Sequence, residues 1–374
     1  MMLATPHTQF DRSPTSDATE PPEAHGIPRD GVKLLVAQPS GIVHARFADL
    51  GEHLHPGDLL VVNNSATLPA AVDGTRSDRP ITVHFSAARR DHDWVVELRP
   101  ATNATAHSPA SGWGYLPLAG ECPQPEIRAG ERIDLPDGAA LVVGSSYPEP
   151  GVAGSRLWTS RLAIEGDVTA YLTRHGRPIR YSYVPRQWPL SSYQTVFARQ
   201  PGSAEMASAA RPFSSELVTS LVASGIAIAP ITLHAGVSSA EAGEPPVAEP
   251  FDVPPSTARM VNLTHEVGGR VIAVGTTVTR ALESAAIGDG EVESSHGWTD
   301  LVLGPDRPVR VVDGLITGWH DAGASHLLLL EAVAGADLVA AAYREAVARG
   351  YLWHEFGDSA LLLPERSVTL RQYR

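Results

Sequence analysis

The fold is decided by residues 268–284, which read Gly-Gly-Arg-Val-Ile-Ala-Val-Gly-Thr-Thr-Val-Thr-Arg-Ala-Leu-Glu-Ser. Val271 to Val274 form an apolar run that is long enough for a buried strand and too short for a helix. Gly275 interrupts this run, and from Val278 to Ala286 apolar residues recur at the spacing of one helical face. The stretch therefore predicts a strand, a glycine turn and a helix.

The start of this helix is a predicted binding position. Thr276 or Thr277 is suited to cap it, and free backbone N–H groups at the positive end of its dipole attract a carboxylate or a phosphate. Thr277, Arg280 and Ser284 are expected on one polar face, with Glu283 beside Arg280. The alternative is an ordinary strand–helix unit in which Arg280 pairs with a surface carboxylate, since this arrangement alone does not specify chemistry.

Composition limits the classes of protein to consider. The chain has 374 residues, of which 43% are hydrophobic, enough for roughly two or three globular domains. Its formal net charge of −13 disfavours a general phosphate-binding surface, although a local basic patch is compatible with it. Cys122 is the only cysteine, so the chain can form neither an internal disulfide nor a cysteine zinc site.

The sequence predicts neither a membrane span nor a secretion signal. Its longest apolar candidate, Leu327 to Ala334, is too short to cross a bilayer, and the N-terminus lacks a basic region followed by an apolar stretch. We therefore expect a cytoplasmic protein with no membrane partner. Residues 1–26 are rich in Pro, Thr, Ser, Asp and Glu, and this predicts a disordered leader.

An early strand is expected at Leu59 to Val62, after a turn signal at residues 55–58. It ends in Asn63 and Asn64, and polar residues just past a strand end are where α/β sheets often bind ligands. The alternative is that both asparagines cap a turn, and the sequence leaves the two interpretations equally open.

Residues 71–162 differ from the rest of the chain in their pattern of hydrophobic and turn-forming residues. Short alternating runs separated by Gly, Pro and Asp predict a small all-β domain, a barrel. The histidines in this region, His84, His92 and His107, are scattered along the sequence and predict no catalytic cluster.

The C-terminal half alternates strands and helices, which predicts a mostly parallel α/β domain. The expected helices are 214–224, 325–334 and 336–349, and the expected strands are 226–233, 300–303, 309–316 and 353–363, the last with Gly357 and Asp358 inside it. Polar residues end three strands, at Thr232 to His234, Gly275 to Thr277 and Thr317 to His320. Because parallel strands end at the same edge of a sheet, these residues are expected to meet there.

Several stretches together resemble the S-adenosylmethionine:tRNA ribosyltransferase-isomerase family of queuosine biosynthesis, in family order over residues 30–364. They are Pro56-Gly57-Asp58-Leu59-Leu60-Val61-Val62-Asn63-Asn64, Tyr193-Gln194-Thr195-Val196-Phe197-Ala198, Thr232-Leu233-His234-Ala235-Gly236, Gly269 to Thr277 with Arg280, Leu282, Glu283 and Ser284, Leu315-Ile316-Thr317 with His320, and Gly357-Asp358. When it occurs together with the other stretches, the block around Gly275 is highly specific for this family.

The resemblance implies a barrel-like α/β main domain, residues 27–70 and 163–374, interrupted by the inserted β-barrel domain of residues 71–162. It also implies that S-adenosylmethionine is a co-substrate that donates a ribosyl group. In the family reaction the aminomethyl group of a 7-deazaguanine in tRNA attacks the ribosyl carbon skeleton. The ribose is rebuilt as an epoxycyclopentanediol, and adenine and methionine leave. The implied partners are S-adenosylmethionine and tRNA, and the oligomeric state stays open.

This reaction needs a base beside the sulfonium, groups that hold or protonate the leaving adenine, and a clamp for the methionine carboxylate. A histidine titrates near neutral pH, so His234 or His320 is the expected base. Thr276, Thr277 and Arg280 are expected to hold the carboxylate. The expected catalytic residues are His234, His320 and Glu283, with no metal ligand. The expected substrate-binding residues are Asn63, Asn64, Tyr193, Gln194, Gly275, Thr276, Thr277, Arg280 and Thr317.

The sequence also departs from the family pattern. Asn63-Asn64-Ser65-Ala66 stands where the family usually has Asn-Asp-Thr-Arg, and Ala210-Arg211-Pro212-Phe213 stands where Gly-Leu-His-Phe is usual. Residues 318–325 lack the usual lysine. The lost Arg and Lys weaken contact with a phosphate-bearing acceptor.

These departures leave three hypotheses open. The first is the family reaction on tRNA. The second is a relative that uses S-adenosylmethionine with a small-molecule acceptor or with none. The third is a non-catalytic S-adenosylmethionine-binding protein. A basic groove beside the Gly275 turn favours the first, a closed acidic or apolar pocket favours the second, and absence of donor binding favours the third.

Overall fold

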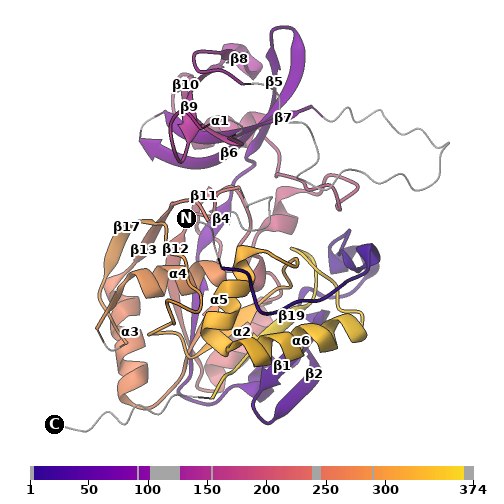
Figure 1. The fold of residues 1–374 in the computed structure, drawn as a ribbon, viewed down its shortest axis with the longest axis vertical. Helices are drawn as coiled ribbons and strands as arrows, with labels where there is room; N and C mark the ends of the chain where they lie inside the picture. The colour runs from indigo at the N-terminus through magenta and orange to yellow at the C-terminus, as the bar shows by residue number, and fades with distance from the viewer. Residues whose placement is uncertain are drawn as a thin grey trace.

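The structure is a computed structural model that describes residues 4–90, 92–101, 127–152, 155–237, 246–288 and 290–365. It confirms the α/β class with an inserted β-barrel, and Figure 1 shows the barrel as a separate body above a larger main domain. Cys122 and His107 lie outside the described residues.

The main domain is built on a nine-stranded mixed sheet. In spatial order its strands are β17 (Ser295–Thr299), β13 (Glu249–Val253), β12 (Ala227–Leu233), β3 (Leu59–Asn63), β14 (Val271–Val274), β18 (Gly314–Thr317), β19 (Ser359–Leu362), β1 (Lys33–Gln38) and β2 (Gly41–Arg46). The central strands β12, β3, β14 and β18 run parallel. The sheet is open, with β17 and β2 at its edges, so the main domain that was expected to be barrel-like has an open sheet.

Both faces of this sheet are covered, because alternate residues of a strand point to opposite sides. Leu59 and Val61 of β3 belong to one core, and Leu60 and Val62 belong to another. The first core takes side chains from α3 (Pro255–Glu266), α4 (Thr276–Ser284), α5 (Ser325–Ala334) and α6 (Ala336–Ala348), and the second takes them from α2 (Ser215–Ala223) and the 3-10 helix Phe47–His53. Burial on both faces explains why the central strands are continuous apolar runs.

No single helix in the described part of the chain is long and apolar enough to cross a membrane. Only α5 and α6 taken together reach that length, and they are bent by 118° at their junction.

The inserted domain is a closed antiparallel barrel. Around the barrel its strands are β10 (Leu157–Ala163), β7 (Asp93–Pro100), β6 (Arg79–Arg90), β5 (Ala71–Arg76), β8 (Arg132–Asp134) and β9 (Ala140–Tyr147). Helix α1 (Val168–His175) follows and packs on the barrel core. The chain enters and leaves this domain side by side, because Ala71 and Arg177 exchange two backbone hydrogen bonds of 2.9 Å.

The N-terminal segment differs from the expected disordered leader. Residues 4–26 pack along the main domain, where Thr8 N donates to Glu331 Oε1 of α5 (2.6 Å) and Arg12 pairs with Asp321 (2.5 Å). The composition predicted disorder because large apolar residues are few. The segment is held by these polar contacts and by the Phe10 ring, which packs on Tyr343 and Trp353; all of these partners are more than 300 positions away, and composition does not reveal them.

Three local predictions are corrected by the structure. Residues 300–303 form no strand, because Leu301 and Leu303 are buried in a loop and the edge strand β17 precedes them. Gly357 and Asp358 precede β19 instead of lying inside it. Helix α4 ends at Ser284 and is capped by Gly275, without a side-chain bond from either threonine.

Candidate functional site

The carboxyl ends of β3, β12, β14 and β18 meet at one edge of the main sheet, as their parallel direction requires. We call this edge the rim; it comprises residues 63–67, 233–237, 275–277 and 317–320. The rim faces the barrel, since Val237 N donates to Ser86 Oγ of β6 (2.9 Å). The polar strand ends predicted from the sequence thus converge at one place.

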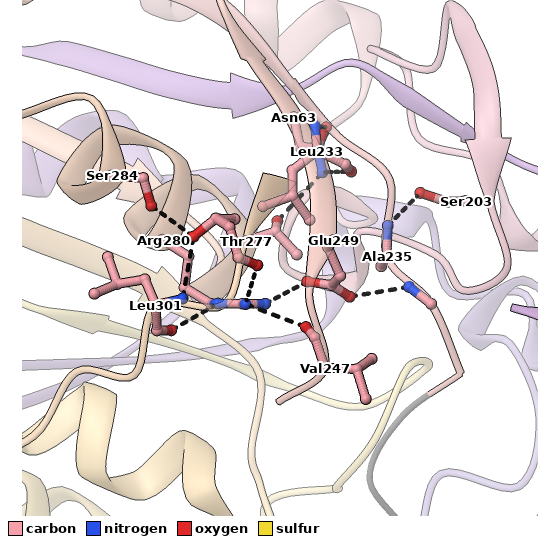
Figure 2. Close-up of polar contacts among 12 residues, drawn as sticks. Asn63, Ser203, Leu233, Ala235, Val247, Glu249, Thr277, Arg280, Ser284 and Leu301 are labelled. Atoms are coloured by element: carbon pink, nitrogen blue, oxygen red, sulfur yellow. Dashed lines mark hydrogen bonds and ion pairs between the residues drawn. The ribbon is translucent and has the colours of Figure 1, made fainter. Parts of the chain in front are cut away.

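Asn63 holds the rim together. Its Nδ2 donates to Leu233 O (2.8 Å) and Thr277 Oγ1 (3.3 Å), as Figure 2 shows. Its Oδ1 accepts from Ser65 N (3.0 Å) and Leu233 N (3.1 Å). An amide offers two donor hydrogens and two acceptor lone pairs, so the side chain of Asn63 is fully used. It therefore joins three elements and has no group left for a ligand.

Asn64 and Gln194 have similar roles in positioning the backbone. Asn64 Oδ1 accepts from Thr232 Oγ1 (2.7 Å), which links β3 to β12. Gln194 pairs with both backbone groups of Thr67, accepting from its N–H (3.0 Å) and donating to its C=O (2.8 Å). The amide of Gln194 and the Oδ1 of Asn64 are therefore engaged with protein atoms, in contrast to the ligand contacts expected from the sequence.

His234 lies in a chain of hydrogen bonds at the centre of the rim. Its Nδ1 is 2.7 Å from Ser65 Oγ, which is 2.6 Å from Ser203 Oγ. Ser203 Oγ also accepts from Ala235 N (3.0 Å). Two short strands that pair in parallel, β4 (Ser65–Thr67) and β11 (Gln200–Ser203), carry the two serines. We call Ser65, His234 and Ser203 the Ser–His–Ser chain.

The imidazole of His234 is held as a neutral base. Burial lowers its pKa below the usual value of 6.5. Among the described residues its Nε2 has no hydrogen-bond partner. Gly202 lies against the ring, and a Cβ added there would come within 2.5 Å of Nδ1. The ring is thus fixed on one side by Ser65 and Gly202 while Nε2 stays available.

The amino end of α4 borders the rim. Gly275 begins the helix with φ 101°, a conformation that favours glycine, and its N donates to Ile316 O (2.8 Å). Thr276 and Thr277 follow it and are only partly buried. The first N–H groups of an α-helix have no acceptor within the helix, so this end supplies donors and a positive dipole at the rim.

Arg280 is buried, not on the polar surface face that the sequence predicted. Figure 2 shows its guanidinium surrounded by acceptors. It pairs with Glu249, and it donates to Leu301 O (3.1 Å) and Thr299 O (2.9 Å). Glu249 in turn accepts from Gly236 N (2.9 Å). Arg280 therefore fixes the His234 strand end through Glu249, and its donors are already occupied.

His320 lies three residues past the end of β18. Its Nε2 is 3.2 Å from Thr317 Oγ1, and its ring stacks on His326 with centroids 4.5 Å apart. Burial and the neighbouring His326 and His354 hold the pKa of His320 well below its usual value. Burial and the charge of Arg280 lower the pKa of His326 to about 4. These imidazoles are also neutral near pH 7.

Glu283 does not reach the rim. Its carboxylate accepts from the backbone N–H groups of Arg310 (2.8 Å), Val311 (2.9 Å) and Val312 (3.1 Å). These residues precede β18, whose opposite end carries Thr317. Burial raises the pKa of Glu283, and the three N–H groups oppose that rise. The structure thus places Glu283 at the far end of the sheet, away from the other expected catalytic residues.

Tyr193 lies just beyond the Ser–His–Ser chain, in the wall of a small cavity. Its side chain is 4% exposed, and its hydroxyl is buried without a hydrogen-bond partner. Of the expected site residues, the rim brings together His234, Asn63, Asn64, Gly275, Thr276, Thr277, Thr317 and His320.

Sequence reasoning missed several residues of this site. Ser203 and Glu249 come from segments without a recognisable catalytic motif, and their role depends on contacts to Ser65 and Gly236. The one available signal was Gly202-Ser203, a pair of small residues suited to close approach. Within the described residues no group of three or more His, Cys, Asp or Glu side chains is arranged to hold a metal ion.

Comparison with known proteins gives a consistent result. The family described as "Queuosine biosynthesis protein" matches residues 6–362 of this chain. A protein of Symbiobacterium thermophilum named S-adenosylmethionine:tRNA ribosyltransferase-isomerase is 35% identical over 351 residues, covering 90% of this chain and 94% of that one. A protein of Moorella thermoacetica with the same name is 33% identical over 374 residues, covering 95% and 98%.

A solved structure is also similar along nearly the whole chain. It is the crystal structure of an S-adenosylmethionine tRNA ribosyltransferase from Thermotoga maritima, which is 26% identical. The alignment covers 95% of this chain and 99% of that chain, with a TM-score of 0.50.

Proposed function

Because this chain belongs to the queuosine biosynthesis protein family, we propose that it transfers and isomerises the ribosyl group of S-adenosylmethionine onto 7-aminomethyl-7-deazaguanine in tRNA. Adenine and methionine are the released products. The observation that carries this proposal is the Ser–His–Ser chain beside the open amino end of α4. This arrangement provides a neutral base and an anion-binding position at one rim.

His234 is proposed to remove the proton from the carbon next to the sulfonium. With the proton of the neutral ring on Nδ1, that nitrogen donates to Ser65 Oγ, and the Ser65 hydroxyl donates to Ser203 Oγ. This tautomer leaves the Nε2 lone pair available. A positioned general base contributes about 10²- to 10⁴-fold to such a step. His320 is the second candidate for this role, because it is also neutral and lies at the same rim.

The methionine carboxylate of the donor is proposed to bind at the amino end of α4, on the N–H groups and hydroxyls of Thr276 and Thr277. Backbone donors and a helix dipole suit a carboxylate. Arg280 was expected in this clamp, but its guanidinium is occupied by Glu249, Leu301 O and Thr299 O. We therefore assign Arg280 to positioning the rim, and we withdraw Glu283 from the catalytic set.

The acceptor and the location follow from the family. We infer that tRNA is the acceptor, as in the names of the relatives, and that the protein acts in the cytoplasm. The departures at Ser65-Ala66 and at residues 318–325 remove a guanidinium and an ammonium from this rim. The proposal therefore expects weaker tRNA binding than in relatives that keep both groups, with a correspondingly higher KM.

The first test is turnover. The purified full chain is incubated with S-adenosylmethionine, with and without tRNA that carries 7-aminomethyl-7-deazaguanine, and adenine and methionine are quantified by mass spectrometry. Release that depends on this tRNA supports the proposal. Release without it indicates a changed acceptor, and absence of both turnover and donor binding overturns the proposal.

The second test concerns the base. His234→Ala is expected to lower kcat by about 10²- to 10⁴-fold, because the proton acceptor is lost. The matched control is His25→Gln, since the side chain of His25 is 63% exposed and lies outside the rim. If His234→Ala turns over at the wild-type rate, the base lies elsewhere and His320 becomes the residue to replace.

A further inference from the structure

The segment that connects α1 to β11 carries a charge opposite to that of the whole chain. We call residues 176–199 the crossing segment. It contains neither Asp nor Glu and four arginines, Arg177, Arg180, Arg186 and Arg199, whereas the chain as a whole has a formal net charge of −13. Net negative charge repels polyanions, and a local group of arginines attracts them. The crossing segment is therefore a candidate surface for a polyanionic partner.

Arg180 and Arg199 carry guanidinium groups that no described carboxylate neutralises. The side chain of Arg199 is exposed and has no hydrogen-bond or ion-pair partner in the described part of the chain. Arg180 is half-buried, and its Nη1 donates to a backbone acceptor, Val184 O (2.6 Å). A guanidinium has five N–H donors and keeps its charge at neutral pH, so both side chains retain donors for an external anion.

The other two arginines of the crossing segment are already paired. Arg177 donates two hydrogen bonds to Asp73 of β5 (2.7 and 2.8 Å). Arg186 is 3.5 Å from Glu20, and its guanidinium lies 4.0 Å from the centroid of the Trp188 ring. Because a carboxylate already offsets their charge, these two arginines are expected to contribute less to the binding of an anion.

Aromatic rings are interleaved with these arginines. Tyr181, Tyr183 and Trp188 are each partly exposed. Tyr181 stacks on Tyr183, and Tyr183 stacks on His354, with centroids 5.9 and 4.1 Å apart. Arginines combined with aromatic rings are typical of surfaces that bind single-stranded RNA, because they offer both phosphate contacts and stacking. Among polyanions, RNA is therefore the partner that this segment fits.

The crossing segment borders the rim beside the Ser–His–Ser chain. Arg199 N donates to Asn64 O (2.8 Å), and Asn64 precedes Ser65, whose hydroxyl is 2.7 Å from His234 Nδ1. Arg199 is thus joined through its backbone to the residue next to this chain. The same edge lacks a guanidinium at Ala66, where the family usually has arginine, and Arg199 supplies one from the neighbouring segment.

We propose that Arg180 and Arg199 of the crossing segment bind backbone phosphates of the tRNA, on the nucleotides that flank the base presented to the rim. The inference rests on the proposed function, because it takes tRNA as the acceptor. A base on which an enzyme acts is turned out of its stack, and the strand on either side of it then passes the residues that border the site. Phosphate contacts orient such a strand without reading its sequence.

Binding of tRNA to the full-length protein tests this assignment. The probe is tRNA that carries 7-aminomethyl-7-deazaguanine and a fluorescein label at its 5′ end, without S-adenosylmethionine, so that binding is measured in the absence of turnover. Fluorescence anisotropy at several salt concentrations gives both Kd and its dependence on salt. Near-ultraviolet circular dichroism checks that each variant retains its tertiary packing.

Arg199→Ala and Arg180→Ala are each expected to weaken tRNA binding about five- to tenfold. Each is also expected to lower the slope of log Kd against log salt concentration by about 0.7–0.9, because one phosphate contact is lost. Arg199→Lys keeps the positive charge and is expected to recover most of both quantities. Arg186→Ala is expected to weaken binding less than about threefold, since Glu20 already offsets its charge.

The matched control is Arg259→Ala. Arg259 is exposed on α3 and has no partner within the described residues. Helix α3 leads from β13 to the amino end of β14, which is opposite to the rim, so this change is expected to leave Kd and the salt slope unchanged. Wild-type affinity and slope in both Arg180→Ala and Arg199→Ala overturn the inference. An equal loss in Arg259→Ala also overturns it, because the attraction would then be unspecific.

Turnover measured on the same preparations separates this inference from the proposed function. Arg199→Ala is expected to raise the KM for tRNA about five- to tenfold and to leave the KM for S-adenosylmethionine within about twofold, which a general loss of structure would not do. Turnover with a wild-type KM for tRNA in both alanine variants overturns the inference alone. Binding of tRNA that depends on Arg180 and Arg199 but is not followed by turnover supports the inference and overturns the proposed reaction.

Discussion

The barrel wall and the domain junction each contain a glutamate with little or partial exposure, and the pKa values of the two are shifted in opposite directions. Glu97 in the barrel is 1% exposed and accepts from His84 Nδ1 (3.2 Å), Arg99 Nη2 (2.7 Å) and Arg156 Nη1 (2.9 Å). Burial opposes its ionisation, but the hydrogen bonds from His84 and Arg99 outweigh it and lower the pKa of Glu97 to about 2. At the junction, burial prevails and raises the pKa of Glu355.

This difference in pairing distinguishes Glu97, a charge that stabilises the fold, from Glu355, a group that is available to a ligand. The carboxylate of Glu97 is bonded to His84 of β6, to Arg99 of its own strand β7 and to Arg156 just before β10, so its oxygen atoms are paired within the barrel domain. Glu355 has a neutral hydroxyl partner and lines a cavity with two unpaired tyrosine hydroxyls. Buried groups that are incompletely paired and have shifted pKa values are typical of functional sites.

The largest loss of stability is expected from Glu97→Ala. Removing one partner of a buried ion pair leaves the other charges uncompensated, and this destabilises a protein by about 3–5 kcal/mol. Hydrogen exchange measured by mass spectrometry on peptides from residues 92–101 reports the local free energy of opening. The control Glu149→Ala, on an exposed barrel loop, is expected to change it by less than about 0.5 kcal/mol. A small effect of Glu97→Ala would mean that the network contributes little.

Lowering the pH is expected to reduce the stability of the barrel through the same Glu97 network, by somewhat less than Glu97→Ala does. The pKa of Glu97 is 4.5 in a model compound and about 2 in the fold, so its stabilisation is complete above pH 4.5 and is lost as the pH falls toward 2. Each tenfold change in proton affinity is worth about 1.4 kcal/mol, which gives about 3 kcal/mol in all. Exchange of the barrel peptides between pH 5 and pH 2, corrected for intrinsic rates, measures it. In Glu97→Gln this component should vanish.

The smallest change in stability is expected from Glu355→Gln. Glutamine has nearly the same shape and still accepts from Tyr183, and burial already disfavours the charge of Glu355, so the free energy of unfolding at pH 7 is expected to change by less than about 1 kcal/mol. Denaturant unfolding followed by tryptophan fluorescence measures it. A loss as large as that from Glu97→Ala would show that Glu355 is ionised, and the contrast between the two regions would fail.

Sequence patterns predicted the strand Val271–Val274, the helix after it and the convergence of polar strand ends, because these depend on local periodicity and on parallel direction. They misplaced Arg280 on an exposed polar face and Glu283 beside it in the catalytic set. The partners that bury these two charges are Glu249 and the backbone of residues 310–312, some 30 positions away, and helical periodicity carries no information about them.

The sequence could not predict the cavity, for the same reason. Its lining joins β4, the crossing after α1, the loop after β11 and the segment before β19. Tyr193 was expected in the site from the family resemblance, but the unpaired state of its hydroxyl depends on packing with Phe356 and the other walls. Such a property belongs to the assembled fold and to no single stretch.

The paired backbone bonds between Ala71 and Arg177 have an evolutionary consequence. The barrel and α1 depart from the main domain and return to it at adjacent points, so the parent sheet requires no rearrangement to accommodate them. A single insertion into the connection after β4 accounts for the present architecture. The ancestral main domain would already have carried the His234 strand end and the α4 turn, and the inserted barrel then enclosed one side of them.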